Sequence, residues 1–326
     1  MNANRFLLRV PPSDRTVTAL LLLAVLVASV CLHAGGPLPE LLTLHVVLLA
    51  GFLACVAAMV RWERQLWVQF VRPAVTVAVI FTCYTSLGKL GVAAMPYLAD
   101  DELARIDTWL FGVDPSNFVQ RYQSPATVEF FSFIYACFIP YINLSIALNC
   151  LGRPPLERDQ FLTGWVFTYA ISFLGYLFIP AHGPLLYPEV HLHRPLEGGY
   201  FLDVVRQGVE ASGGLQGVFP SLHVGGSVYL CLFDLKTNRL RGLTYLPMVL
   251  GIYVATILLR YHYVVDLIAG TVIAAGCIPL GQRVFLRWAR RRQSAGLPAL
   301  PGGEADALPA VSGPGAAGAA PVFSAD

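Results

Sequence analysis

The chain has 326 residues, of which 56% are hydrophobic and only 13% charged, and its mean hydropathy is +0.61. An ordinary soluble domain carries roughly a quarter charged residues, so this composition excludes a soluble enzyme. The formal net charge of +2 says little by itself. All seven cysteines lie within apolar runs and none forms a CxxC pair, so we expect neither a disulfide framework nor a zinc knuckle.

Long apolar runs divide the chain, and the charges are confined between them. A helix needs about 20 apolar residues to cross a hydrocarbon core roughly 30 Å thick. We therefore predict an all-α integral membrane protein with about eight transmembrane helices, at 16–34, 41–60, 73–90, 128–150, 161–180, 221–235, 243–259 and 264–285. The first run has the position of a signal peptide, but Ala-Ser-Val-Cys at 28–31 is a poor cleavage site. We expect this run to remain as a membrane anchor.

The basic residues are unevenly distributed between the two sides of these spans. When the spans alternate in direction, sixteen Lys and Arg residues fall on one side and six on the other, namely Lys89, Arg105, Arg121, Arg194, Arg206 and Arg260. Cytoplasmic loops are enriched in Lys and Arg. We therefore predict that both termini are cytoplasmic and that 91–127, the loop 181–219 and the junction 260–263 face the outside.

Two segments outside the spans have a recognisable character. Residues 97–121 are acidic with apolar positions near helical spacing, which predicts a helix on the outer interface with an architectural role. The Ala-, Gly- and Pro-rich tail at 294–326 lacks a periodic apolar face, so we expect a disordered cytoplasmic extension. His33 and His45 lie at the outer ends of the first two spans, and we interpret both as interfacial histidines.

The first of two chemical clusters is Gly-Val-Phe-Pro-Ser-Leu-His at 217–223. Ionisable groups within membrane spans are costly, so they suggest a function by default. Pro220 suits the first turn of a helix that begins at the outer surface. The free N–H groups of that turn, together with the Ser221 hydroxyl, predict a site for an oxyanion. His223 lies on the same turn, so we expect it to face the same pocket.

The second cluster is Arg-Tyr-His-Tyr-Val-Val-Asp at 260–266. His262 and Asp266 are spaced i, i+4, so on a helix the carboxylate can accept the imidazole Nδ1–H and leave Nε2 as a nucleophile or base. This arrangement is typical of covalent catalysis. The alternative is a buried hydrogen bond that merely joins two helices. The Pro-Ser-x-His sequence at a second outer helix end favours catalysis.

Phe-Pro-Ser-Leu-His, followed after 38 residues by His-Tyr-Val-Val-Asp, resembles the second and third signatures of the type 2 phosphatidic acid phosphatase superfamily. The Pro-Ser-Leu-His form is similar to the inositol phosphorylceramide synthase branch. The resemblance covers roughly 73–285 and implies a six-helix core that works without metal, with its site at the outer membrane surface. It divides the chain into a transmembrane hairpin at 1–72, a catalytic core at 73–293 with outer loops 91–127 and 181–219, and the tail at 294–326.

The resemblance assigns roles to four residues. His262 matches the nucleophile that attacks phosphorus to give a phosphohistidine, and Asp266 matches the carboxylate that orients it. His223 matches the histidine that protonates the leaving oxygen and then activates the acceptor. Ser221 matches a serine that contacts the phosphate.

The sequence departs from the family pattern in the residues that clamp the phosphate. Arg194-Pro195 fits the Arg-Pro of the first signature, but Tyr187 takes the place of its Lys, and Thr256 takes the place of the third-signature Arg. A phosphoryl group in transfer needs cationic donors, so Arg260 is a candidate for the missing charge. Its alternative role is that of an interfacial arginine. Tyr187 is a candidate to hydrogen-bond a phosphate or head group.

Three alternatives stay open from the sequence. A metal site is the first, with candidate ligands His182, His191, His193, His223, His262 and Asp266. A transporter is the second; it would use intramembrane His and Asp as proton relays, but near the bilayer midplane. A non-catalytic scaffold is the third, and it is disfavoured because both motif histidines and the aspartate are present.

We therefore predict a metal-independent membrane phosphotransferase or phosphatase for a lipid phosphate or phosphodiester, with no cofactor and no nucleic-acid partner. An alcohol acceptor such as ceramide, inositol or a sugar would make it a synthase, as in sphingolipid metabolism. Water as acceptor would make it a phosphatase of phosphatidic acid or a prenyl pyrophosphate. The Ala-, Gly- and Arg-rich composition suggests a bacterial inner membrane, with the site facing the periplasm or cell exterior.

Overall fold

A computed structural model describes residues 3–35, 39–187, 195–212 and 214–301. All regular structure in these ranges is helical. Among them, seven helices are long and apolar enough to cross a membrane when α7 and α8 are taken together: α2 (Pro12–His33), α3 (Pro39–Arg61), α4 (Val68–Ala94), α7–α8 (Pro125–Leu151), α9 (Pro155–Phe178), α12 (Arg239–Leu258) and α13 (Val264–Ser294). The prediction of an all-α integral membrane protein is confirmed.

The sixth predicted span is a helix that is shorter than the other seven. α11 (Leu222–Thr237) has 16 residues, which gives a length of about 24 Å against a hydrocarbon core of roughly 30 Å. It packs against α9, α12 and α13, and most of its side chains are buried. Protein rather than lipid therefore surrounds most of this helix.

The fourth predicted span is divided at Cys137 into α7 (Pro125–Ala136) and α8 (Phe138–Leu151). Pro140 explains the break, because proline has no N–H to donate to the carbonyl of Ala136 four residues earlier. Proline is tolerated in the first turn of a helix, where its N–H would have no partner. The break therefore falls just before the first turn of α8.

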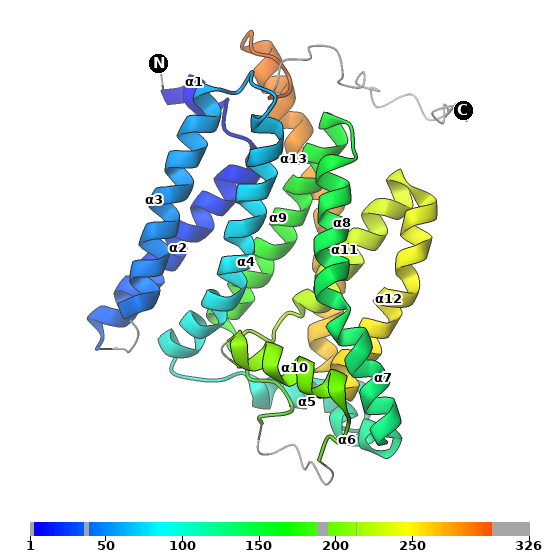
Figure 1. Cartoon of the computed structure of the whole chain (residues 1–326). Helices are drawn as coiled ribbons and strands as arrows, with labels where there is room; N and C mark the ends of the chain where they lie inside the picture. Colours follow the sequence, from blue (N-terminus) through cyan, green and yellow to red (C-terminus); the bar gives the residue numbers. More distant parts are fainter. Residues whose placement is uncertain (1–2, 36–38, 188–194, 213, 302–326) are drawn as a thin grey trace.

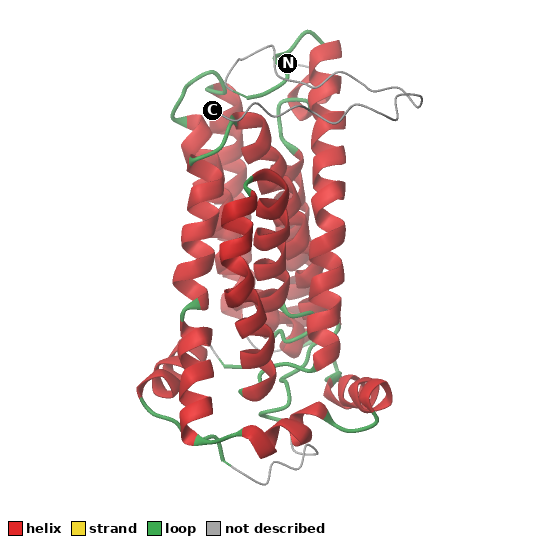
Figure 2. Cartoon of the chain, turned by 90° about the vertical axis from the view of Figure 1, so that its right-hand side faces the viewer, coloured by secondary structure: helices red, strands yellow, loops and turns green. Residues whose placement is uncertain are grey.

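Helices that lie across the bundle close one of its ends, as Figure 1 and Figure 2 show. They are α5 (Asp100–Phe111), α6 (Pro115–Val119), the 3-10 helix η1 (Gln120–Tyr122) and α10 (Tyr200–Ala211). We call this end the site end. α1 (Ala3–Leu7) and the last turns of α13 lie at the opposite end. The helix predicted within 97–121 is confirmed, whereas α10 lies in a loop for which no helix was predicted.

α9 forms the centre of the bundle, with α2, α4, α11 and α13 packed around it. Phe161, Trp165 and Phe173 are fully buried on this helix. Where α9 crosses α13, two glycines let the backbones approach closely: a Cβ on Gly281 would lie 2.5 Å from the Gly164 Cα. Small residues at such crossings allow tight helix packing in membranes, so a larger residue at either glycine would push α13 away from the core.

One histidine of the α2–α3 hairpin has an environment that differs from the prediction. His45 is fully buried, with its Nδ1 2.7 Å from the Leu41 carbonyl and its Nε2 3.2 Å from the Ser86 hydroxyl of α4. The sequence did not predict this burial, which arises because the face of α3 that carries His45 packs against α4. His33, by contrast, is exposed.

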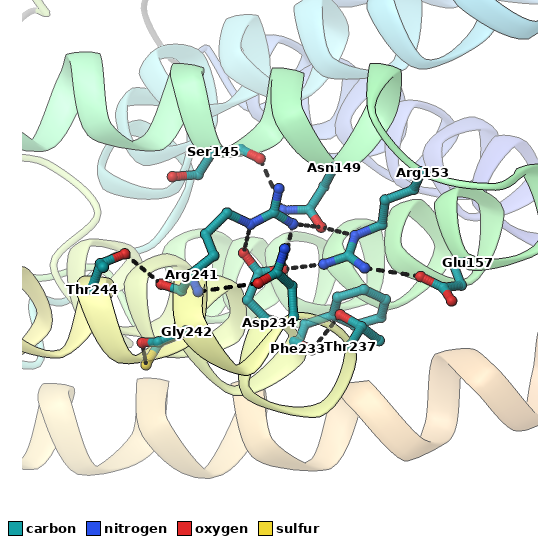
Figure 3. Close-up of polar contacts among 12 residues, drawn as sticks. Ser145, Asn149, Arg153, Glu157, Phe233, Asp234, Thr237, Arg241, Gly242 and Thr244 are labelled. Carbon is teal, nitrogen blue, oxygen red and sulfur yellow. Dashed lines mark hydrogen bonds and ion pairs between the residues drawn. The ribbon is translucent and has the colours of Figure 1, made fainter. Parts of the chain in front are cut away.

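A buried charge network joins four helices at the end opposite the site, as Figure 3 shows. Asp234 of α11 is fully buried and accepts hydrogen bonds from Arg153 at 2.5 Å and from Arg241 at 2.6 Å. Asn149 accepts from both arginines, and Glu157 accepts from Arg153. The network therefore connects the turn between α8 and α9 to the turn between α11 and α12.

The start of the C-terminal tail is packed, in contrast to the expected disordered extension. Ala299 and Leu300 are buried with Phe285 and Trp288 of α13. The short apolar run at 297–300 supplies enough contact area to hold this segment against the helix. The remainder of the tail, 302–326, lies outside the described residues.

Candidate active site

Two short segments at the site end bring the predicted clusters together. Ser221 caps α11, since its hydroxyl accepts from the Val224 N–H at 3.4 Å. The Ser221 N–H donates to the carbonyl of Asp266 at 3.1 Å, which joins the first turn of α11 to the first turn of α13. Pro220 precedes the cap, although it was predicted within the first turn.

The connection between α12 and α13 carries His262. Arg260 in this connection has a φ of 64°, a left-handed conformation that is uncommon for residues other than glycine. The Asp266 carboxylate accepts from the Tyr263 N–H at 2.9 Å and lies 3.3 Å from His262 Nδ1. The predicted contact between His262 and Asp266 is therefore present, although His262 precedes the helix instead of lying on it.

A continuous chain of polar contacts runs from Asp266 through both histidines to Tyr135. His262 Nε2 lies 3.2 Å from His223 Nδ1, and His223 Nε2 lies 2.9 Å from the Tyr135 hydroxyl. Phe138 packs against His223 with 4.7 Å between ring centroids. Tyr135 was not predicted, because it lies far from both motifs in the sequence and resembles the other aromatic residues of its span.

The surroundings of His262 favour its neutral form. Burial lowers its pKa well below the usual value for histidine, and the neighbouring His223 lowers the pKa further. A neutral imidazole keeps a lone pair on one nitrogen. Because Nδ1 faces the Asp266 carboxylate, that lone pair is on Nε2, the nitrogen that faces His223.

A cavity of about 370 Å³ opens beside the two histidines. Its polar lining residues include Tyr84, Tyr135, His223 and His262. Its walls are mostly apolar and include Ala136, Phe138, Ile139, Val204, Val205 and Val209. No lysine or arginine lines it among the residues that the structure describes. An apolar pocket with a few convergent polar groups is the usual form of a small-molecule site.

The predicted phosphate-binding residues are not among the described residues that line this cavity. Arg260 is buried and donates to the Gln123 side chain, and burial lowers its pKa. The Tyr187 hydroxyl donates to Asp101 at 3.1 Å. Ser221 is fully buried at its cap. Arg194 lies outside the described residues.

Asp100 of α5 holds the loop that follows α9. It is buried and accepts from the His182 N–H at 3.0 Å and from the Gly183 N–H at 2.8 Å. It also accepts from the hydroxyl of Tyr263, next to the catalytic candidate His262, at 3.0 Å. One carboxylate therefore positions two loops of the site.

Asp107, two turns further along α5, caps α13. It accepts from the N–H groups of Val264 at 2.6 Å and Val265 at 2.8 Å. A carboxylate at this position satisfies N–H groups that have no partner within the helix, and the helix dipole stabilises its charge. The architectural role predicted for 97–121 agrees with these contacts. The individual aspartates were missed, although the seven-residue spacing of Asp100 and Asp107, with the apolar Leu103 between them, was readable in the sequence.

His182 has a bracing role in the same region, since its Nδ1 lies 2.9 Å from the Leu215 carbonyl. The other two loop histidines considered for a metal site, His191 and His193, lie outside the described residues. Over the described ranges, no group of three or more His, Cys, Asp or Glu side chains is arranged to hold a metal ion.

Comparison with known proteins identifies related sequences. The family model described as the PAP2 superfamily matches residues 101–280, more than half of the chain. A PA-phosphatase related-family protein of Dictyostelium discoideum is 34% identical over 126 residues, which cover 37% of this chain and 23% of that protein. The match therefore spans less than a quarter of the relative's length. No solved structure matches the chain.

Proposed function

Because this chain belongs to the PAP2 superfamily, we propose that it is a membrane enzyme that cleaves a lipid phosphate or phosphodiester through a phosphohistidine at His262. One observation carries the proposal: His262 lines a mostly apolar cavity, with its Nε2 3.2 Å from His223 and its Nδ1 3.3 Å from Asp266. The apolar walls suit a lipid chain.

In the first step, substrate binding replaces the hydrogen bond between the two histidines, so that the phosphorus faces His262 Nε2 and the leaving oxygen faces His223 Nδ1. The negative charge of the substrate favours the protonated form of His223. His262 Nε2 attacks phosphorus, the bond to the leaving oxygen breaks, and that oxygen takes the Nδ1 proton of His223. Asp266 accepts the Nδ1–H of His262 and stabilises the positive charge that develops on this ring.

In the second step, His223 accepts a proton from the incoming water or alcohol. The oxygen of that molecule attacks phosphorus and releases His262 Nε2, which returns both histidines to their starting forms. Pro-Ser-Leu-His, which resembles the motif of inositol phosphorylceramide synthases, favours an alcohol acceptor. The PA-phosphatase related relative favours the second candidate, a phosphatase of phosphatidic acid or a similar lipid phosphate.

The charge on the phosphoryl oxygens requires cationic or N–H donors. We assign this role to Arg194, on its match to the family's Arg-Pro motif, and to the backbone N–H of His223 in the first turn of α11. Arg260 and Tyr187 bind other side chains, which supports a role in holding the loops of the site.

We propose that the site faces the outside of the membrane, at the periplasmic face of a bacterial inner membrane. The loops at the site end carry few Lys and Arg, whereas the opposite end carries α1 and the basic end of α13. Cytoplasmic loops are the basic ones. The site histidines gather at one end of the bundle instead of its middle, which disfavours a transporter.

The test is a mass-spectrometric product assay in EDTA with purified wild type, His262→Ala and His33→Ala. Lipid phosphates and phospholipids serve as donors, and ceramide and inositol as acceptors. Free phosphate that is lost in His262→Ala identifies a phosphatase, and a new phosphodiester lipid that is lost there identifies a synthase. His33 is exposed, so His33→Ala should keep full activity. Product that persists in His262→Ala contradicts the proposal.

A further inference from the structure

We propose that Tyr135 is a positioning residue that keeps Nδ1 of His223 directed at the reacting atoms throughout the catalytic cycle. The inference rests on the proposed function and adds a residue that neither motif contains. Tyr135 lies in the last turn of α7, at the break before α8, and its hydroxyl is 2.9 Å from His223 Nε2.

The protons of the resting site follow from the carboxylate end of the chain. Asp266 accepts from the Tyr263 N–H, so it acts as an acceptor and His262 Nδ1 donates to it. His262 Nε2 is then an acceptor, so His223 Nδ1 must be the donor across the 3.2 Å contact. His223 Nε2 is left with a lone pair. The Tyr135 hydroxyl donates to this lone pair.

During turnover, Nε2 of His223 needs a hydrogen-bond acceptor instead of a donor. When His223 is protonated to serve the leaving oxygen, Nε2 carries a proton and needs an acceptor. A hydroxyl can donate in one state and accept in the other by rotation of its hydrogen. Tyr135 therefore partners Nε2 in both protonation states, and Nδ1 remains the nitrogen that exchanges protons with the substrate.

The polar contact of His223 Nε2 is the Tyr135 hydroxyl. The titratable groups that face His223 among the described residues are Tyr84 of α4, Tyr135 and His262. Tyr84 packs edge-on at 6.2 Å between ring centroids, and Phe138 covers another face with an apolar ring. A protonated imidazole without a partner for Nε2–H is unfavourable in such a site.

Packing and hydrogen bonding by Tyr135 can be separated by experiment. Its ring packs at a tilt against His223, with 4.8 Å between ring centroids, and against Tyr261, with 5.2 Å between ring centroids. Tyr135→Phe keeps both ring contacts and removes the hydroxyl alone. Tyr141→Phe is the matched control. Tyr141 lies six residues after Tyr135, on α8, and its hydroxyl donates to the Ser227 carbonyl.

For Tyr135→Phe we expect kcat to fall roughly 10- to 100-fold, by analogy with the loss of a partner that orients a metal-bound imidazole, with little change in KM. The alkaline limb of the pH–rate profile should move to lower pH, because protonated His223 has lost its acceptor. A purely structural role would not move this limb. Wild-type kcat and an unchanged pH profile in Tyr135→Phe would overturn the proposal.

Nitrogen-15 NMR of the histidines gives an independent readout that does not require activity or a folded variant. In the substrate-free wild type, neutral His223 should carry its proton on Nδ1, and a proton on Nε2 would overturn the proposal. If His262→Ala remains active, the proposed function fails. The NMR measurement on the wild type still tests whether His223 Nε2 has the lone pair that accepts from Tyr135. The two failures are therefore distinguishable.

Discussion

His223 Nδ1 and His262 Nε2 lie 3.2 Å apart, so in the substrate-free protein the proposed nucleophile is hydrogen-bonded to the proposed general acid. Different elements carry these rings: His223 lies in the first turn of α11, and His262 lies in the connection between α12 and α13. The hydrogen bond from the Ser221 N–H to the Asp266 carbonyl joins the N-terminus of α11 to the first turn of α13. The distance between the histidines therefore depends on how these two helix ends pack together.

The first prediction concerns the titration of His262. Burial and the neighbouring His223 both lower its pKa, so the ring should remain neutral at pH values below about 6.5, the ordinary midpoint for histidine. The His262 ring is neutral above its lowered pKa and becomes protonated as the pH falls through that pKa. An NMR titration, with the signal assigned by its loss in His262→Ala, should give a midpoint below 6.5. A midpoint at or above 6.5 would contradict this description of the site.

The second prediction tests whether the cavity holds the lipid chain. Gly208 of α10 lines the cavity, and a Cβ there would meet no atom within 4 Å. Leucine is also a better helix former than glycine, by roughly 1 kcal/mol, so Gly208→Leu should fold and fill part of the cavity. We expect KM for a long-chain substrate to rise at least about tenfold, since a side chain of this size displaces several methylenes.

Gly276→Leu is the control for this substitution, because Gly276 is exposed on α13 and also has open space around it. It should leave KM unchanged. Activity of Gly208→Leu on a short-chain phosphate ester should fall much less than activity on the long-chain substrate. Equal KM values for the long-chain lipid in wild type and Gly208→Leu would place the lipid chain elsewhere.

The third prediction concerns the charge network around Asp234. Asp234→Asn leaves Arg153 and Arg241 without their carboxylate in a buried position. Removing one partner of a buried ion pair destabilises a protein by about 3–5 kcal/mol, so the variant should unfold at a clearly lower temperature in detergent. Asp203→Asn breaks an exposed pair with Arg206, which should cost at most about 1 kcal/mol. Equal unfolding temperatures for the two variants would show that the network does not stabilise the bundle.

The fourth prediction follows from the buried position of His45. His45→Ala removes its hydrogen bond with Ser86 between α3 and α4 and should lower the free energy of unfolding by about 1–3 kcal/mol. The folded fraction should keep its activity, since His45 lies outside the site. Thermal unfolding beside exposed His33→Ala checks this. Identical stability of the two variants would instead support the interfacial environment that the sequence suggested.

Local patterns in the sequence predicted most of the membrane helices and the contact between His262 and Asp266. Hydropathy over 20 residues and an i, i+4 spacing are both properties of a single segment, so they can be read without knowledge of the fold. The break at Cys137 was also readable from Pro140, although it was not predicted.

Contacts between distant segments could not be read in this way. Tyr135 meets His223 across 88 positions of sequence, and Asp107 caps α13 across 157. The burial of His45 likewise depends on how the α2–α3 hairpin packs against α4. Arg260 was a candidate phosphate ligand because the third-signature Arg is missing, whereas its contact with Gln123 depends on the position of the segment before α7.

The most direct test of the account is to trap the covalent intermediate. Wild-type enzyme would be mixed with a lipid phosphate carrying radioactive phosphorus, quenched rapidly in alkali, in which phosphohistidine is stable, and digested for mass spectrometry. The account predicts label on His262 during turnover and none in His262→Ala. Turnover without label on His262, or label on a different residue, would contradict it.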